Sequence, residues 1–203
     1  MPIGIGEYQK TQAFETGTDG PIVALGRHGA AFRDWATLLR AYADHHARAP
    51  LWIVGREDLP EVERNGVPVP PNVTFLPLVP LAKLGEIIEG ARFVVLPLPE
   101  REQSLGQLTV LFAMAMGKAV VASGVVGLAD YLTDGETGLL YPPGDAAGLS
   151  ARLKILLDDP PRAVAMGRAA RERQETAFND RLMGERWEKV LVTTTGRPDS
   201  GLS

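Results

Sequence analysis

The sequence of 203 residues contains no cysteine, only 6% aromatic residues, and no apolar run near the roughly 20 residues that a membrane-spanning helix needs. The lack of cysteine excludes disulfides and thiolate metal sites, as is natural in a reducing compartment. The segment Met1–Gly6 also lacks the basic stretch and long apolar core of a secretory signal. We therefore expect a cytoplasmic protein with no transmembrane segment.

An excess of charge of one sign is also missing. The net charge is -4, and charged residues make up 23% of the chain. So small a charge gives no whole-chain attraction to nucleic acid, and we expect no nucleic acid partner. What is present is an ordinary globular composition, 45% hydrophobic, and a length that fits one domain with appendages.

The recurring pattern is a short apolar run, a turn, and a longer stretch with helical spacing. The runs are continuous rather than alternating, which is typical of strands buried on both faces. They lie at Ile22–Leu25, Leu51–Val54, Val73–Leu76, Phe93–Leu98 and Ala119–Ala122. Helical spacing follows at about 34–47, 81–89 and 106–116. Strands alternating with helices predict an α/β fold, a doubly wound parallel sheet in a single Rossmann-like domain.

The last third of the chain predicts helices only. Asp145 is expected to cap a helix over Ala146–Leu157, and Pro160 to open the next. Asn179 or Asp180 is expected to cap a last helix. These patterns divide the chain into a linker-like segment at 1–20, the Rossmann-like domain with its C-terminal helices at 21–192, and a disordered tail at 193–203.

Ligands of such sheets bind beyond the carboxyl ends of the strands, so the loops there are the first candidates for a site. Arg27 follows the first strand, and Arg33 comes just before the next helix. Because a guanidinium presents a planar fork of donors, both side chains suit phosphate oxygens. The alternatives are that both are solvated loop charges, or that Arg33 pairs with Asp34.

A second loop, 100–109, leads from the most apolar strand straight into a helix. A helix start presents unpaired N–H groups and a positive dipole end, and Gly106 would admit a ligand close to the backbone. The alternative is an ordinary helix cap by Ser104. The dinucleotide-binding pattern Gly-x-Gly-x-x-Gly and the Walker loop are both missing. His45 and His46 have no recognisable third metal ligand in the sequence, so we expect no metal.

Between about Pro21 and Val192, several stretches follow one another in an order that is recognisable as a whole. The most specific is Ser104–Gln107 running into Ala113–Ala122, and Asp134–Asp145 follows it. Together with the strands Ile22–Leu25, Leu51–Val54 and Val73–Leu76, they resemble one half of a known enzyme fold. That half is the C-terminal, donor-binding domain of the group-one retaining glycosyltransferases, which have the GT-B architecture of two Rossmann-like domains.

The resemblance implies roles for the matching positions. Arg27 and Arg33 would hold the diphosphate of a nucleotide-sugar donor, and the loop at Leu78 and Val79 would border its base. The backbone over 106–108 would contact phosphate. The candidate donor-binding residues are therefore Arg27, Arg33, Leu78, Val79, Ser104, Gly106, Gln107, Leu108 and Phe112. The nucleotide sugar is a substrate here, and we expect no cofactor and no metal.

The chain departs from the family at two acidic positions. The family carries two glutamates eight positions apart, and here Ser104 and Phe112 stand in their places. A phenyl ring has no lone pair with which to accept hydrogen bonds from a ribose. Phe112 is then either part of the core or part of the pocket wall. We favour the pocket wall, because Leu111, Ala113 and Met114 already supply core on neighbouring faces.

The resemblance also implies an N-terminal domain or subunit that holds the acceptor. We therefore expect a glycosyltransferase donor-binding domain that transfers a sugar together with such a partner. Two alternatives stay open at this point. One is a degenerate, non-catalytic nucleotide-sugar-binding or regulatory module, and the other is part of a nucleotide-sugar epimerase.

Overall fold

The computed structural model describes residues 19–26, 32–101 and 105–178. Within this part of the chain, six parallel strands form one sheet in the order β3-β2-β1-β4-β5-β6. The strands are β1 (Ile22–Leu25), β2 (Leu51–Val54), β3 (Val73–Leu76), β4 (Phe93–Leu96), β5 (Val120–Ser123) and β6 (Gly138–Tyr141). The strand order reverses between β1 and β4, so the predicted doubly wound α/β class is confirmed.

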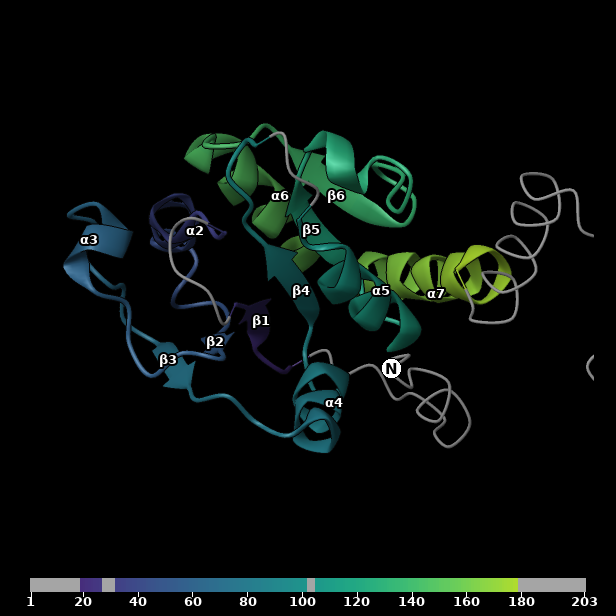
Figure 1. The fold of residues 1–203 in the computed structure, drawn as a ribbon, viewed down its shortest axis with the longest axis horizontal. Helices are drawn as coiled ribbons and strands as arrows, with labels where there is room; N and C mark the ends of the chain where they lie inside the picture. The colour runs from purple at the N-terminus through teal and green to yellow at the C-terminus, as the bar shows by residue number, and fades with distance from the viewer. Residues whose placement is uncertain (1–18, 27–31, 102–104, 179–203) are drawn as a thin grey trace, which may run out of the picture.

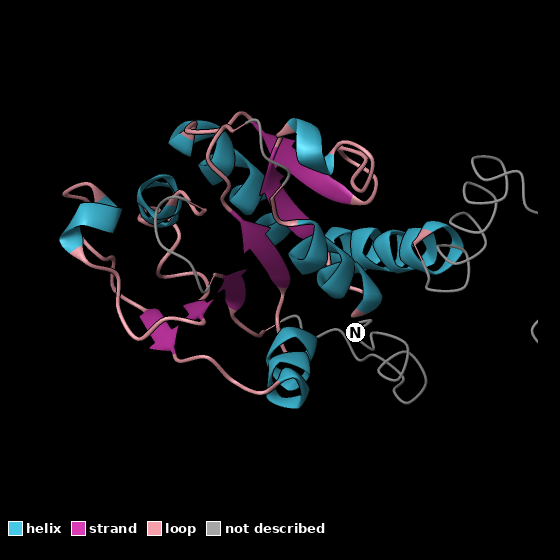
Figure 2. Ribbon diagram, in the orientation of Figure 1, coloured by secondary structure: helices cyan, strands magenta, loops and turns pink. Residues whose placement is uncertain are grey.

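Helices connect the strands and extend the C-terminal side of the domain, as Figure 2 shows. They are α2 (Trp35–Tyr42), α3 (Glu61–Arg64), α4 (Leu81–Glu89), α5 (Gln107–Ala115), α6 (Ala146–Asp158) and α7 (Pro160–Ala177), with the short 3-10 turn η1 (Val126–Leu128). Figure 1 shows α2 and α6 on one side of the sheet and α4, α5 and α7 on the other. None of these helices is both long and apolar enough for a bilayer crossing.

The core lies on both faces of the sheet, because successive strand residues point to opposite sides. Ile22 and Ala24 of β1 pack into one cluster with α2 and α6. Val23 and Leu25 pack into the other cluster with α4 and α5. Helix α7 contributes side chains to both clusters. Burial on two faces explains why the strand sequences are continuous apolar runs rather than alternating ones.

The predicted starts of the two C-terminal helices, α6 and α7, are confirmed. Asp145 accepts a hydrogen bond from Gly148 N (2.9 Å) and begins α6. Pro160 opens α7, and Asp159 caps it by accepting from Arg162 N (3.0 Å). The last predicted helix, capped by Asn179 or Asp180, lies outside the described residues, as do most of the proposed N-terminal and C-terminal segments.

Several boundaries differ from the sequence prediction. The edge strand β6 was not predicted, because its four residues begin with a glycine and precede the Pro-Pro-Gly turn. Strand β4 ends at Leu96 rather than Leu98, because the next buried N–H group, on Leu98, donates to a side chain instead of a strand. Helix α2 ends at Tyr42, since the chain turns there and His45 N donates to Tyr42 O (2.8 Å). The single turn α3 was also not predicted.

Candidate functional site

Arg33 lies at the carboxyl edge of the sheet, between β1 and α2. Its Nε donates to Leu25 O (2.8 Å), at the end of β1, and its Nη1 donates to Phe32 O (2.8 Å). Its Nη2 lies 3.5 Å from Thr109 Oγ1, in the first turn of α5. These contacts fix the guanidinium between the end of one strand and the start of a helix that follows another. The structure thus brings together two of the loops that the sequence singled out.

The charge of Arg33 has no described counter-charge. Burial lowers its pKa to about 10, so the guanidinium is still protonated at neutral pH. Asp34 does not pair with it, contrary to one alternative above, because its Oδ1 accepts from Thr37 N (3.1 Å) and caps α2. Across residues 19–26, 32–101 and 105–178, no carboxylate forms an ion pair with Arg33. A partly buried cation in this position favours an anionic ligand.

Helix α5 begins at this edge, and no side chain of the described residues caps it. Its N-cap is Gly106, whose φ of +87° is the left-handed conformation that favours glycine. A Cβ on this residue would lie 2.8 Å from Leu96 Cδ2 and 3.0 Å from Leu98 Cδ1. The glycine is therefore required by its own φ and by the packing beneath it. The N–H groups of the first turn, beside Arg33, have no intrahelical acceptors.

Two other predicted residues, Gln107 and Leu108, lie in the first turn of α5. Gln107 Nε2 donates to Gly127 O (3.1 Å), which ties α5 to the turn η1. Leu108 is exposed, with 61% of its surface accessible. Arg27 and Ser104, which were also predicted, lie outside the described residues. The proposed contacts of all these residues with a donor stay predictions.

Leu78 and Val79 follow β3 at the same edge of the sheet. Leu78 is exposed, whereas Val79 packs against the cluster that contains α4 and α5. Strand β3 is separated from β1 by β2, so these residues lie two strands away from Arg33. Their proposed role beside a base therefore requires a ligand that extends along the edge of the sheet.

Phe112 is in the core rather than in a pocket wall. Its side chain is 7% exposed and belongs to the cluster that includes Val110, Ala113 and Met114. The sequence argument assigned the core to the neighbouring faces of α5 and left one face for a ligand. It missed that α7 packs against α5, so that this helix is covered by more than the sheet alone. The structure supports the core alternative and not the pocket wall that we favoured.

Thr109, Ser123 and Tyr141 are polar residues of this edge that sequence reasoning did not single out. Thr109 contacts Arg33, while Ser123 and Tyr141 are buried at the ends of β5 and β6. For Ser123 and Tyr141, the available signal was a hydroxyl-bearing residue at the end of an apolar run, where an apolar residue would otherwise stand.

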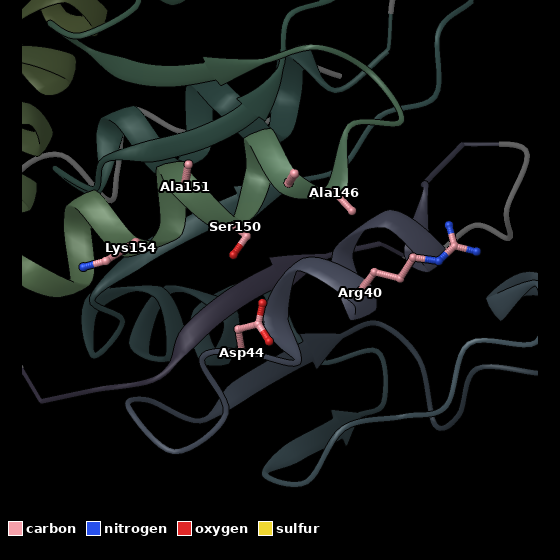
Figure 3. Close-up of a pocket in the computed structure, with 7 residues that line it drawn as sticks. Arg40, Asp44, Ala146, Ser150, Ala151 and Lys154 are labelled. Atoms are coloured by element: carbon pink, nitrogen blue, oxygen red, sulfur yellow. The ribbon is translucent and has the colours of Figure 1, made fainter.

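A surface groove of about 370 Å³ lies between α2 and α6, away from these residues (Figure 3). It is lined by Arg40, Asp44, Ala146, Ala147, Ser150, Ala151 and Lys154. Figure 3 shows Asp44 and Ser150 pointing toward each other across it. The groove contains none of the predicted donor-binding residues, and Lys154 is already paired with Asp158.

Metal ligands do not gather in the part of the chain that the structure describes. His45 is buried and its Nε2 lies 2.9 Å from Ser150 Oγ, while His46 Nδ1 lies 2.7 Å from Ala43 O. The two histidines are thus engaged separately. The expected independence of metal stays a prediction for the chain as a whole.

Comparison with known proteins gives the family. The model of the family described as "Glycosyl transferases group 1" matches residues 20–159. The chain belongs to this family. The resemblance to the donor-binding domain is therefore confirmed at the level of family and fold, and the match covers both the Arg33 loop and the start of α5.

Two curated relatives illustrate the similarity. Phosphatidyl-myo-inositol mannosyltransferase of Mycolicibacterium smegmatis is 35% identical over 153 residues, which cover 73% of this chain and 39% of that protein. Glycogen synthase of Mycobacterium tuberculosis is 36% identical over 97 residues, which cover 48% of this chain and 22% of that protein. The chain thus spans between a fifth and two fifths of the length of these relatives.

Solved structures agree on the fold. Sucrose-phosphate synthase from Thermosynechococcus elongatus is 29% identical with a TM-score of 0.70, and the match covers 87% of this chain and 47% of that one. Alr3699/HepE of Anabaena, in complex with UDP and glucose, is 18% identical with a TM-score of 0.71, covering 94% and 52%. In both comparisons, this chain covers about half of a longer solved chain.

Proposed function

We propose that this chain is the donor-binding half of a group 1 glycosyltransferase and that it binds the diphosphate of a nucleotide sugar at the carboxyl edge of its sheet. The observation that carries the proposal is Arg33, a partly buried cation with no described carboxylate partner, next to the start of α5, which no described side chain caps. The family of the chain makes a nucleotide sugar the natural source of the anion.

The chemistry of sugar transfer explains why such a site is useful. As the bond between the sugar and the nucleoside diphosphate breaks, the leaving diphosphate gains negative charge. The Arg33 guanidinium and the first-turn N–H groups of α5 are fixed before the ligand arrives, so little reorganisation is needed to stabilise that charge. We propose that these groups act without a metal ion, and that the protein works in the cytoplasm, where nucleotide sugars are available.

Sugar transfer would also require an acceptor site. The relatives are longer than this chain, so we propose that a second domain or subunit supplies the acceptor across the carboxyl edge. Holding both substrates in reactive geometry provides much of the rate of such a reaction. The isolated chain is therefore expected to bind the donor but to transfer no sugar. Turnover by the purified chain alone would contradict the need for a partner.

The test is calorimetric titration of the chain with UDP, GDP and ADP, using Arg33→Ala and a matched control. Arg40→Ala removes the same charge from an exposed position of α2. We expect Arg33→Ala to weaken binding by about 1.5–3 kcal/mol, the value of hydrogen bonds to charged groups, and Arg40→Ala to leave it unchanged. The proposal is wrong if no diphosphate binds the wild-type chain, or if both variants bind as it does.

A further inference from the structure

One peptide group just beyond β4 is held from both sides. The carbonyl oxygen of Pro97 accepts a hydrogen bond from Asp34 N (2.9 Å), at the start of α2. The N–H of Leu98 belongs to the same peptide plane and donates to Ser123 Oγ (2.8 Å), at the end of β5. One partner follows β1 and the other ends β5, and these two strands flank β4. Because a peptide is planar, both bonds together fix its orientation.

Ser123 is itself held in place. Its hydroxyl donates to Tyr141 Oη (3.0 Å), at the end of β6, while its oxygen accepts from Leu98 N. Ser123 and Tyr141 are 0% and 2% exposed, so water does not compete for these bonds. A buried hydroxyl with both of its hydrogen-bonding functions engaged has one preferred orientation. The ends of β4, β5 and β6 are thus joined by side chains rather than by the sheet ladder.

The held peptide lies between the two halves of the candidate anion site. On one side, Asp34 directly follows Arg33. On the other side, Leu98 Cδ1 would lie 3.0 Å from a Cβ on Gly106, so the Leu98 side chain packs directly beneath the start of α5. A shift of Leu98 must therefore move either this helix start or the contacts beneath it. The distance between the guanidinium and the first-turn N–H groups depends on this peptide.

We propose that Ser123 and Tyr141 are positioning residues for the anion site, and that they set the start of α5 relative to Arg33 through the Pro97–Leu98 peptide. The inference rests on the proposed function of that site. Neither side chain contacts the ligand. Their removal changes the spacing of the groups that do, so a diphosphate can satisfy the guanidinium or the helix start but not both at full strength.

The experiment compares three variants of the full chain. Ser123→Ala removes the acceptor of Leu98 N, and Tyr141→Phe removes only the hydroxyl that orients Ser123. The matched control is Thr137→Val, at the opposite edge of the sheet. Thr137 is 3% exposed and its Oγ1 accepts from Thr133 N (2.8 Å), so this variant also deprives a backbone N–H group of a buried hydroxyl. Each variant is characterised by its melting temperature, its Kd for UDP and for inorganic pyrophosphate, and its ¹H–¹⁵N spectrum without ligand.

We expect losses of melting temperature for both Ser123→Ala and Thr137→Val, because each leaves a backbone donor without its hydroxyl acceptor. Only Ser123→Ala should also weaken the binding of UDP and of pyrophosphate, raising each Kd by about tenfold, as when one charge-assisted hydrogen bond is lost. Tyr141→Phe should raise these Kd values less than Ser123→Ala does. In the ligand-free spectra, Ser123→Ala and Tyr141→Phe should shift the amide signals of Gln107–Thr109, whereas Thr137→Val should not.

The positioning role is rejected if Ser123→Ala binds the probes as the wild type does, or if all three variants change binding equally. It is also rejected if the α5 amide signals do not move in either carboxyl-edge variant. Failure of the wild-type chain to bind either probe would overturn the proposed function instead. In that case the amide signals still decide whether Ser123 and Tyr141 set the geometry of the helix start.

Discussion

Phe112→Glu separates the core position of this residue from a position in a ligand pocket. The phenyl ring is 7% exposed among apolar side chains of α4, α5 and α7. Removing a buried phenyl typically costs about 3–5 kcal/mol. A carboxyl placed there without a hydrogen-bond partner adds about 1–3 kcal/mol even when it is neutral. The total approaches the entire stability of a typical domain, which is about 5–15 kcal/mol.

The assay is urea denaturation followed by circular dichroism, with nucleoside diphosphate binding measured in parallel. Leu108→Glu is the matched control, because Leu108 lies on the same helix and is exposed. A glutamate in the first turn of a helix is also favourable to the helix dipole. We expect Leu108→Glu to unfold near the wild-type urea concentration and Phe112→Glu to be largely unfolded without urea. A stable Phe112→Glu variant that gains affinity for a diphosphate would refute the core position.

Three further predictions concern charge. Arg33→Lys should weaken diphosphate binding nearly as much as Arg33→Ala does, since an ammonium cannot reproduce the planar fork that contacts Leu25 and Thr109; equal binding by Arg33→Lys and the wild type would refute this. Chelation by EDTA should leave the Kd for diphosphate unchanged, and loss of binding on chelation would contradict metal independence. Burial lowers the pKa of Lys118 from 10.5 to about 8, so between these values the unfolded chain holds more protons and stability should rise with pH. Urea denaturation at pH 8 and 9.5 should show this rise in the wild type, and Lys118→Met should reduce it.

Local patterns were enough to predict much of the fold. The strand that ends at Leu25 and the helix Leu81–Glu89 were predicted at their observed bounds, since each has a strong apolar pattern and clear limits. Asp145 and Pro160 act as predicted, because capping depends on residues within one turn. Such features need no information from distant parts of the chain.

The errors arise where distant segments decide the outcome. Phe112 lies in a cluster to which α7 contributes Ala170, and α7 begins nearly fifty residues later and packs against α5. The sequence around Phe112 cannot show this. Similarly, β6 is an edge strand of four residues, and its pairing with β5 in the sheet, rather than its composition, makes it a strand. The link from Leu98 through Ser123 to Tyr141 joins three strands and has no local pattern at all.

The buried Lys118 and the partly buried Arg33 show how the edges of the sheet differ. At the amino edge, Lys118 is 2% exposed and its Nζ donates to Glu89 O (2.6 Å) and Ala91 O (2.9 Å). An ammonium has three N–H groups, so most of its capacity is used by carbonyls near the end of α4. Lys118 therefore joins two segments of the fold and has little capacity left for a ligand.

Arg33 at the carboxyl edge is different. A guanidinium has five N–H groups, and its described contacts engage three, one of them at a distance of 3.5 Å. Its strongest contacts, to Leu25 O and Phe32 O, position the group without neutralising it, since carbonyls carry no net charge. A cation that is held by neutral acceptors, with donors remaining and a helix start beside it, retains its attraction for an anion. This difference, rather than burial alone, is why we propose Arg33 as a binding residue and Lys118 as a structural one.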